Sequence, residues 1–347
     1  MVLLPGLERF ELFGKPALQK FLDSRLPSAP ITWIDERPGG KLQLEFWRWL
    51  SSESIDDEYR VLALPALELR EVQKLAELQE LLPDGSCEIV PLPDSPVPSL
   101  AIAAASESLP PSPPPLDDGA AAKARTAAWV DRTLSPSGLR FCPYTQSAEI
   151  SGSGLEGYGV TPAPISYAYC ADGSLKALLV SFWSEASKML DAGEEGTSSI
   201  VLSAPQWDDR WHEWYTVVFP LLEASVLAAG LGRELGIVCF HPSYVTPDEE
   251  WLVKHRFGHM HAARKLRGYV KQHEPELAES LSDEQLSWAG AYQRRSPNAM
   301  INVLWARQLE QAEQKRKSSF LYTRNIQRAL SEGVDALESA SAEERKR

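Results

Sequence analysis

The chain has 347 residues, 44% of them hydrophobic, so it is long enough for two or three folded domains that each bury a core. Its 48 acidic residues outnumber the 35 basic ones, and the net charge of −13 argues against broad binding of nucleic acids or anionic membranes. Four scattered cysteines are too few for a disulfide framework, which favours a reducing, intracellular compartment.

The first twenty residues, "MVLLPGLERFELFGKPALQK", do not resemble a secretory signal or a transit peptide. They contain acidic residues early and no small-residue cleavage site. We therefore expect a cytoplasmic protein, or one of the plastid stroma if a presequence has been removed. No stretch of the chain reaches the roughly 18 uninterrupted apolar residues that a membrane-spanning helix needs, so we expect no membrane span.

The first half alternates strand-like and helix-like patterns. Three stretches are typical of strands, namely "APITWI", "YRVLALP" and "CEIVPLP". Between them lie two amphipathic helical patterns, "LQLEFWRWLSS" and "LELREVQKLAELQELL". This βαβαβ order favours a parallel or mostly parallel sheet with crossover helices. We predict an α/β domain over residues 1–93.

A spacer rich in proline and alanine is predicted over residues 94–122. Nine of the 26 prolines lie in residues 91–115, where no basic residue occurs, and this composition is typical of an extended linker. Beyond it we predict a second α/β domain over residues 123–333. The last residues, 334–347, are predicted to be a charged tail.

The second domain repeats the pattern of the first. "APISYAY" resembles "APITWI", "LLVSFWSEA" resembles "LQLEFWRWL", and "VLSAPQW" resembles "VLALPAL". Either two βαβαβ units have converged through the same propensities, or the chain contains an internal duplication, which we favour. The first copy has no counterpart of the histidine and cysteine motifs described next. We therefore expect a degenerate, structural or regulatory first half and a second half that contains the site.

Two residues of the second half stand at positions suited to chemistry. His241 and Pro242 end the apolar strand pattern "GIVCF", and ligands bind at the carboxyl ends of strands in open α/β sheets. Cys142 lies in "PSGLRFCPYTQ", where a glycine and two prolines favour an exposed loop, which is a precondition for thiol reactivity. The alternatives are a hydrogen-bonded structural histidine and a small packing cysteine.

A basic segment, residues 254–271, contains His255 and His259 at a spacing compatible with a metal pair. No acidic or cysteine ligand stands at a matching interval, and the nearby arginines would repel a cation, so we predict no metal site. An anion-facing or solvated helix is the better interpretation. We predict no nucleic-acid binding through it, because the rest of the chain is acidic.

Four segments of the second half carry a resemblance to a known family. "AAWVDRTLSPSGLRFCPYT", "VCFHPSY", "RRSPNAMINVLWAR" and "YTRNIQRALSEG" follow one another as in domain of unknown function family 1415, which occurs in bacteria and algae. The resemblance covers about residues 123–333. That family has no established activity, so the resemblance implies a site but leaves the reaction and any cofactor unknown.

The resemblance implies the site residues one by one. Residues that match the Cys-Pro, Phe-His-Pro, Arg-Ser-Pro and Arg-Asn-Ile motifs are Cys142, His241, Arg295, Ser296, Arg324 and Asn325. The sequence departs from the family at Arg294, where asparagine is usual, and at Asn302, where a histidine is usual. The second departure argues against a second catalytic histidine.

We expect these residues to form one cleft for a small anionic substrate. Pro297 favours a helix that begins there with Ser296 as its N-cap, and the N–H groups at a helix start attract anions. The predicted protein is an intracellular enzyme of unknown reaction, with Cys142 as nucleophile or redox thiol and His241 as general acid or base. Substrate binding is assigned to Arg295, Ser296, Arg324 and Asn325. The alternative is a non-catalytic assembly or interaction protein with a protein partner.

Overall fold

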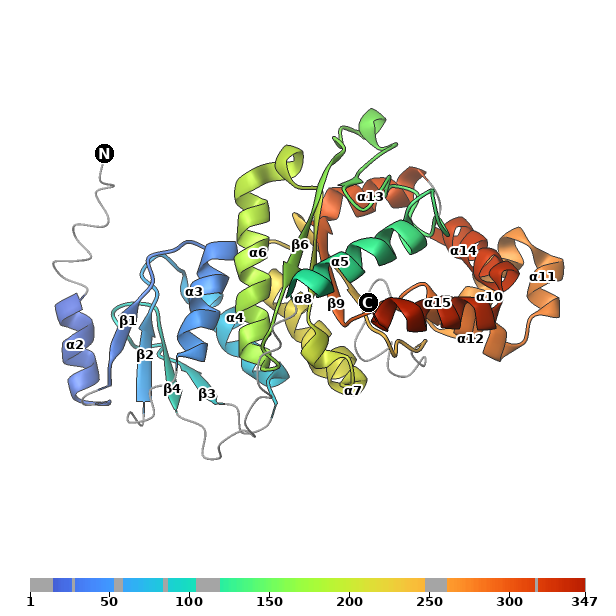
Figure 1. Cartoon of the computed structure of the whole chain (residues 1–347). Coiled ribbons are helices and arrows are strands. Elements are labelled where there is room, and N and C mark those ends of the chain that lie inside the picture. The colour runs from blue at the N-terminus through green and yellow to red at the C-terminus, as the bar shows by residue number, and fades with distance from the viewer. Residues whose placement is uncertain are drawn as a thin grey trace. The chain divides into compact units, whose positions relative to one another are not determined.

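The computed structural model describes residues 15–26, 29–52, 59–83, 87–103, 119–246, 261–315 and 318–346. Contacts divide the chain into two units (Figure 1). The first contains Met1–Pro111 and Leu221–Leu231, and the second contains Ser112–Pro220 and Gly232–Arg347. Both combine helices with one sheet, so the predicted α/β class is confirmed, but both sheets are mixed rather than mostly parallel, with one parallel strand pair in each. No helix of the described residues has the length and apolar character needed to cross a bilayer.

The first unit is built around a four-stranded sheet. Its elements are α2 (Lys15–Asp23), β1 (Ile31–Trp33), α3 (Gly40–Ser51), β2 (Tyr59–Ala63), α4 (Leu69–Glu77), β3 (Glu88–Pro91) and β4 (Ser99–Ala103). The strand order is β1-β2-β4-β3. Strands β1 and β2 are parallel, whereas β4 is antiparallel to both of its neighbours. Helix α2 lies on one face of the sheet, and α3 and α4 lie on the other (Figure 1).

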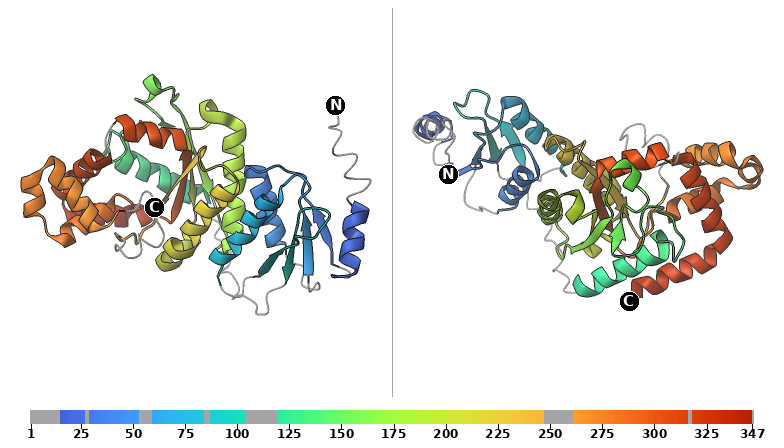
Figure 2. Two further views of the ribbon diagram at one scale, coloured as in Figure 1. Left: turned by 180° about the vertical axis from the view of Figure 1, so that it is seen from behind. Right: turned by 90° about the horizontal axis from the view of Figure 1, so that it is seen from above.

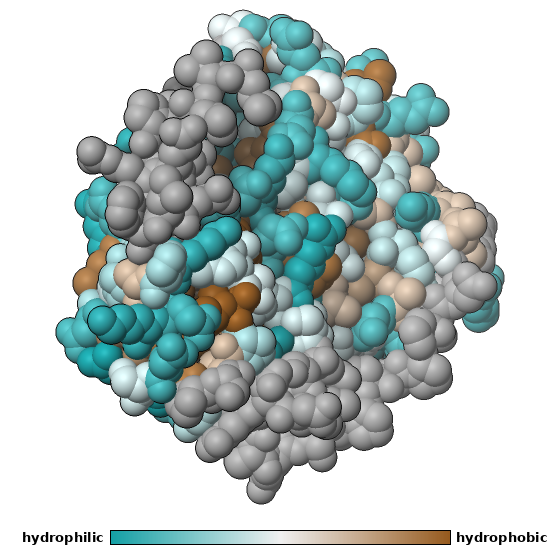
Figure 3. All heavy atoms as spheres, turned by 90° about the vertical axis from the view of Figure 1, so that its left-hand side faces the viewer, coloured by the Kyte–Doolittle hydropathy of each residue, from teal (hydrophilic) through white to brown (hydrophobic). Residues whose placement is uncertain are grey.

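Apolar spacing explains why α3 forms and which side it buries. Leu42, Phe46 and Leu50 recur every four residues and are at most 2% exposed. Helix α4 begins with a capping box, in which the side chains of Glu68 and Glu71 satisfy each other's backbone N–H groups. In the view of Figure 3, hydrophilic and hydrophobic side chains of the described residues are interspersed. The hydrophobic ones do not gather into one large patch on this face.

The second unit is built around a five-stranded sheet of order β5-β6-β7-β9-β8. Its strands are β5 (Ile150–Ser151), β6 (Ala163–Tyr169), β7 (Ser199–Ser203), β8 (Leu235–Phe240) and β9 (Met300–Trp305). Its helices are α5 (Gly119–Trp129), α6 (Leu175–Gly196), α7 (Trp211–Glu213), α10 (Ala263–His273), α11 (Pro275–Ser280), α12 (Asp283–Tyr292), α13 (Ala306–Lys315), α14 (Ser318–Glu332) and α15 (Val334–Lys346). The intervening α8 (Phe219–Ala228) contributes most of its length to the first unit. Helices α5 and α6 cover opposite faces of the sheet (Figures 1 and 2).

Four strands of the second sheet repeat the order and directions of the first, whereas β5, which pairs antiparallel with β6, has no counterpart. Strands β6 and β7 are parallel, and β9 lies antiparallel between β7 and β8, as β4 lies between β2 and β3. The connections differ in length, because β3 leads to β4 through residues 92–98, whereas β8 leads to β9 through residues 241–299. That longer connection contains α10, α11 and α12.

Three predicted boundaries are corrected by the structure. Residues 99–103 of the predicted linker form β4, because the apolar run "SLAIA" pairs with strands on both sides, and Gly119 of the same linker begins α5. The predicted charged tail is the helix α15, with Leu337 and Glu344 buried. No helix begins at Pro297, since the apolar sequence that follows forms the strand β9. His255 and His259 lie outside the described residues.

Candidate functional site

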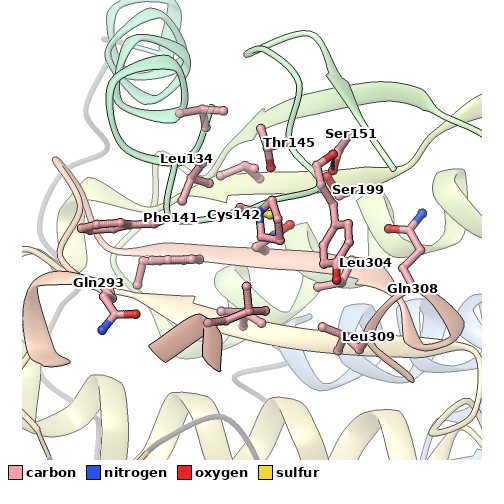
Figure 4. Close-up of a pocket in the computed structure, with 18 of the residues that line it drawn as sticks. Leu134, Phe141, Cys142, Thr145, Ser151, Ser199, Gln293, Leu304, Gln308 and Leu309 are labelled. Atoms are coloured by element: carbon pink, nitrogen blue, oxygen red, sulfur yellow. Dashed lines mark hydrogen bonds between the residues drawn. The ribbon is translucent and has the colours of Figure 1, made fainter. Parts of the chain in front are cut away.

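A pocket of about 250 Å³ lies in the second unit, on the face of the sheet that α5 covers (Figure 4). Its floor consists of side chains that four strands present to the same face: Ile165, Ser199, Val201, Val238, Phe240, Asn302 and Leu304. The remaining walls come from the end of the helix that starts as α5, from the loop 141–145, from residues 151, 155, 293 and 294, and from α13 and α14. The pocket therefore lies within one structural unit.

Apolar side chains form most of the lining, and polar groups lie at both ends. Figure 4 shows Gln293 and Gln308 at opposite ends, with Cys142 between them. At the Gln293 end, Arg294 donates to the hydroxyl oxygen of Tyr322 at 3.3 Å and lies 5.5 Å from the centre of the Phe240 ring. Arg294 is the only charged residue among the described residues that line the pocket.

Cys142 reaches the pocket because the chain folds back onto the end of a helix. Helix α5 continues into a π-helical turn, Val130–Leu134, and the Cys142 N–H donates to the carbonyl of Leu134 at 3.3 Å. The N–H of Leu139 likewise donates to the carbonyl of Arg132, and the N–H of Phe141 donates to that of Thr133. At Gly138 a Cβ atom would lie 1.9 Å from the carbonyl oxygen of Arg132, so the turn requires glycine. The predicted loop position of Cys142 is confirmed.

Helix α14 holds the same loop through three side chains. Arg324 Nη2 donates to the carbonyl of Arg140 at 2.7 Å, and Arg328 Nη1 donates to that of Leu139 at 2.7 Å. Asn325 Nδ2 donates to Phe141 O and to Gln293 Oε1, both at 3.0 Å. Asn325 lines the pocket, whereas Arg324 does not. Arg324, which was predicted to bind substrate, thus holds the Cys142 loop through the Arg140 carbonyl.

His241 follows β8 as predicted, but it is fully buried and does not line the pocket. Its Nδ1 accepts from the N–H of Ser243 at 3.0 Å, so Nε2 carries the proton and donates to the carbonyl of Trp207 at 2.9 Å. Burial lowers the pKa of His241 to about 4. With both nitrogens engaged by other groups, the predicted Cys142–His241 pair is not formed, and the structural alternative describes this histidine.

Arg295 and Ser296 also lie outside the pocket lining. Arg295 forms an ion pair with Glu338 of α15 and donates its Nε to the carbonyl of Tyr244 at 3.2 Å. Ser296 donates its hydroxyl to the carbonyl of Asn298 at 2.6 Å. The structure thus places Arg295, which was predicted to bind substrate, in an ion pair with a residue of the segment that was interpreted as a tail.

Two pocket residues that were not predicted as site residues have polar atoms without a partner. Asn302 Oδ1 and Gln308 Nε2 are buried and have no hydrogen-bond partner. Asn302 interrupts the apolar strand "MINVLW", and Gln308 is 6% exposed in the first turn of α13. The interrupted apolar run was the available signal for Asn302, because a polar side chain within a buried strand requires a partner.

No family model, curated protein or solved structure matches the chain. The resemblance to family 1415 therefore stays a prediction, and the function must be inferred from the pocket itself.

Proposed function

We propose that the second unit binds a small molecule with an apolar body and one anionic group. The observation that supports this most directly is a largely apolar pocket with Arg294 as the one charged residue among its described lining residues. Small-molecule sites have this character, with few polar groups that fix the orientation of the ligand. An apolar cavity of about 150 Å³ holds benzene, so about 250 Å³ gives room for on the order of ten non-hydrogen atoms.

Arg294 is suited to hold the anionic group. A guanidinium binds a carboxylate or phosphate through two parallel hydrogen bonds, and its attraction is stronger in a partly buried site than in water. The guanidinium of Arg294 is held in place by its hydrogen bond to the Tyr322 hydroxyl and by the neighbouring Phe240 ring. The anionic end of the ligand is thus assigned to the Gln293 end of the pocket.

Cys142 extends the proposal to an enzyme, because its thiol faces the middle of the pocket, where the ligand body would lie. Such a reaction would proceed without His241 as its base. We also propose that the two units arose by internal duplication. The shared strand order and directions support that origin.

The test is a calorimetric titration with octanoate and with octanamide, which have equal numbers of non-hydrogen atoms. Octanoate should bind saturably and raise the unfolding temperature, since a ligand of the native state stabilises it by mass action. Octanamide should bind roughly tenfold more weakly, because it lacks the charge-assisted bonds to Arg294. Hexyl phosphate is the second anion to test.

The neighbouring arginines provide a matched pair of variants. Arg294→Gln should remove the preference for octanoate over octanamide, whereas Arg295→Gln should keep it, because Arg295 pairs with Glu338 outside the pocket. Equal affinities in the unmodified protein would refute the anionic part of the proposal. If neither anion binds, the non-catalytic assembly role becomes the better interpretation.

A further inference from the structure

The Thr145 hydroxyl is a polar group of the pocket that has no bonding partner in the protein. Thr145 lines the pocket and is 5% exposed, and its hydroxyl makes no hydrogen bond to another described residue. The unpartnered hydroxyl oxygen of Thr133 is sealed from solvent, whereas that of Thr145 keeps open surface. A ligand in the pocket can therefore accept a hydrogen bond from Thr145.

The loop that contains Thr145 also contains the Cys142 thiol. All five residues of the loop 141–145 line the pocket, and Cys142 is partly exposed. Its backbone N–H donates to the carbonyl of Leu134, which holds this part of the loop against the end of the helix. Figure 4 shows the thiol between the two ends of the pocket. One short loop thus brings a nucleophile and a hydrogen-bond donor to the same pocket.

The pocket offers Cys142 no side chain of the usual acid–base kind. No histidine, aspartate or glutamate is among the described residues that line it. A thiol that attacks an ester or an amide needs a proton donor for the departing oxygen or nitrogen, because these leaving groups are strongly basic. A thioester needs none, since its leaving thiolate is about as basic as the attacking one. The composition of the pocket therefore favours a thioester as the electrophile.

We propose that Cys142 accepts the acyl group of a small thioester whose leaving thiol carries the anionic group. This inference rests on the proposed function, because Arg294 holds that anion, and it names the substrate class of the same pocket. The anion lies at the Gln293 end, the reacting carbonyl lies beside Cys142, and the acyl chain points toward the Gln308 end. The apolar chain stays among apolar side chains, whereas the charged thiol returns to water.

The step is an exchange of one thioester for another. The Cys142 sulfur, as its thiolate, attacks the acyl carbon, and a new carbon–sulfur bond forms. The carbonyl oxygen becomes an oxyanion that accepts a hydrogen bond from the Thr145 hydroxyl. The bond to the original sulfur then breaks, and the leaving thiolate keeps its electron pair and takes the proton that Cys142 released. No oxidant or reductant is consumed.

The experiment treats the full chain with S-butanoyl mercaptoacetate and with S-butanoyl mercaptoacetamide. Both contain about ten non-hydrogen atoms, the number for which the pocket has room. Mass spectrometry of the intact chain and of its peptides measures acylation at each cysteine. Cys142 should react saturably, and about tenfold faster with the anionic thioester than with the neutral one at low concentration. Cys87 and Cys239 provide internal references, because they are also partly exposed and do not line the pocket.

Three variants assign the roles. Arg294→Gln should remove the preference for the anionic thioester. Thr145→Val should slow acylation of Cys142 roughly tenfold, since it removes a donor to the oxyanion. The same variant should leave alkylation by iodoacetamide unchanged, because that reaction forms no oxyanion. Thr133→Val is the matched control and should change neither rate, because Thr133 is fully buried and does not line the pocket.

The outcomes separate this inference from the proposed function. Acylation of all three cysteines at similar, unsaturable rates would overturn the inference, while saturable binding of octanoate would still support the proposed function. Slower reaction of Thr145→Val with iodoacetamide as well would show that Thr145 only positions the loop, which contradicts its assigned role. Octanoate should protect Cys142 and leave Cys87 reactive, and bound octanoate that gives no protection would also overturn the inference. Failure of octanoate to bind, together with unselective acylation, would overturn both proposals.

Discussion

The side-chain amide of Asn325 donates to the carbonyl oxygen of Phe141 at 3.0 Å, although 184 positions separate them along the chain. The second N–H of the same amide donates to Gln293, which lines the other wall of that end of the pocket. One side chain therefore joins the Cys142 loop, α14 and the end of α12. The position of the thiol depends on this junction.

Replacement of Asn325 by leucine should loosen the loop. Two buried hydrogen bonds are lost, and the oxygen atoms of Phe141 and Gln293 lose a donor, so the free energy of unfolding should fall by about 2–4 kcal/mol. Urea titration measures that change, and the alkylation rate of Cys142 should rise with it. Ser331→Ala on the same helix is the control, because Ser331 makes one exposed local bond. Equal effects in both variants would contradict the role of Asn325.

Gly138 and Gly268 should respond to alanine in opposite directions. At Gly138 the new Cβ meets the Arg132 carbonyl oxygen at 1.9 Å, so the loop must move, and we expect a loss of at least about 2 kcal/mol. Gly268 is exposed within α10 and has open space around it, so alanine should stabilise by about 0.5–1 kcal/mol. Thermal unfolding of both variants checks the pair. A tolerated Gly138→Ala would show that the turn is less constrained than its geometry indicates.

His241 should make the protein less stable in acid. Its pKa is about 4 in the folded state, against the ordinary histidine value of 6.5 in the unfolded chain, so below pH 6.5 the unfolded state takes up the proton first. The loss begins as the pH falls below 6.5 and is complete near pH 4, and this difference of about 2.5 pH units corresponds to about 3 kcal/mol. Burial raises the pKa of Asp208 and that of Glu223 to about 7. These two groups have the opposite pH dependence, because they lower the free energy of unfolding as the pH rises.

The histidine contribution is isolated by comparison with His241→Gln, which keeps a neutral hydrogen-bonding side chain. Between pH 7 and pH 4 the unmodified protein should lose about 3 kcal/mol more than the variant. Proton NMR gives an independent readout, because the imidazole resonance that the variant lacks should titrate near pH 4. A titration of that resonance near pH 6.5 would contradict the buried, neutral state.

Separation of the chain at residue 111 should weaken the first unit. Leu221–Leu231 group with that unit, and Leu221 and Leu222 are fully buried, yet the cut leaves them on the other fragment. A fragment of residues 1–111 should therefore show poor chemical-shift dispersion. Addition of residues 219–231 through a Gly/Ser linker should improve the dispersion, whereas a scrambled segment should not. A well-folded fragment without the addition would contradict this assignment.

Local patterns were sufficient to predict much of this fold. The strand predicted before His241 ends at Phe240, and the apolar spacing of "LQLEFWRWLSS" gives α3. Cys142 was placed on a loop because glycine and proline restrict the backbone locally. These predictions succeeded because each depends on residues that are close in sequence.

The remaining features depend on partners far along the chain. Nothing local in "SLAIA" or "MINVLW" shows that each strand enters the sheet between two earlier strands, because register and neighbours are set by non-local pairing. We assigned Arg295 to ligand binding because its ion-pair partner, Glu338, lies 43 positions later and no local pattern indicates the pairing. His241 lost its predicted catalytic role for the same reason, since its proton is held by the carbonyl of Trp207.

The central position of β9 has a consequence for the order in which the protein folds during synthesis. In the described sheet β8 pairs only with β9, so it stays unpaired until the 59 residues from His241 to Ala299 and then β9 itself have been made. At about 5–20 residues per second this delay is roughly 3–12 s. The first sheet has no such delay, because β4 follows β3 after residues 92–98. The pocket floor is therefore assembled late, and until β9 arrives the unpaired β8 and the open edge of β7 are both exposed to mispairing.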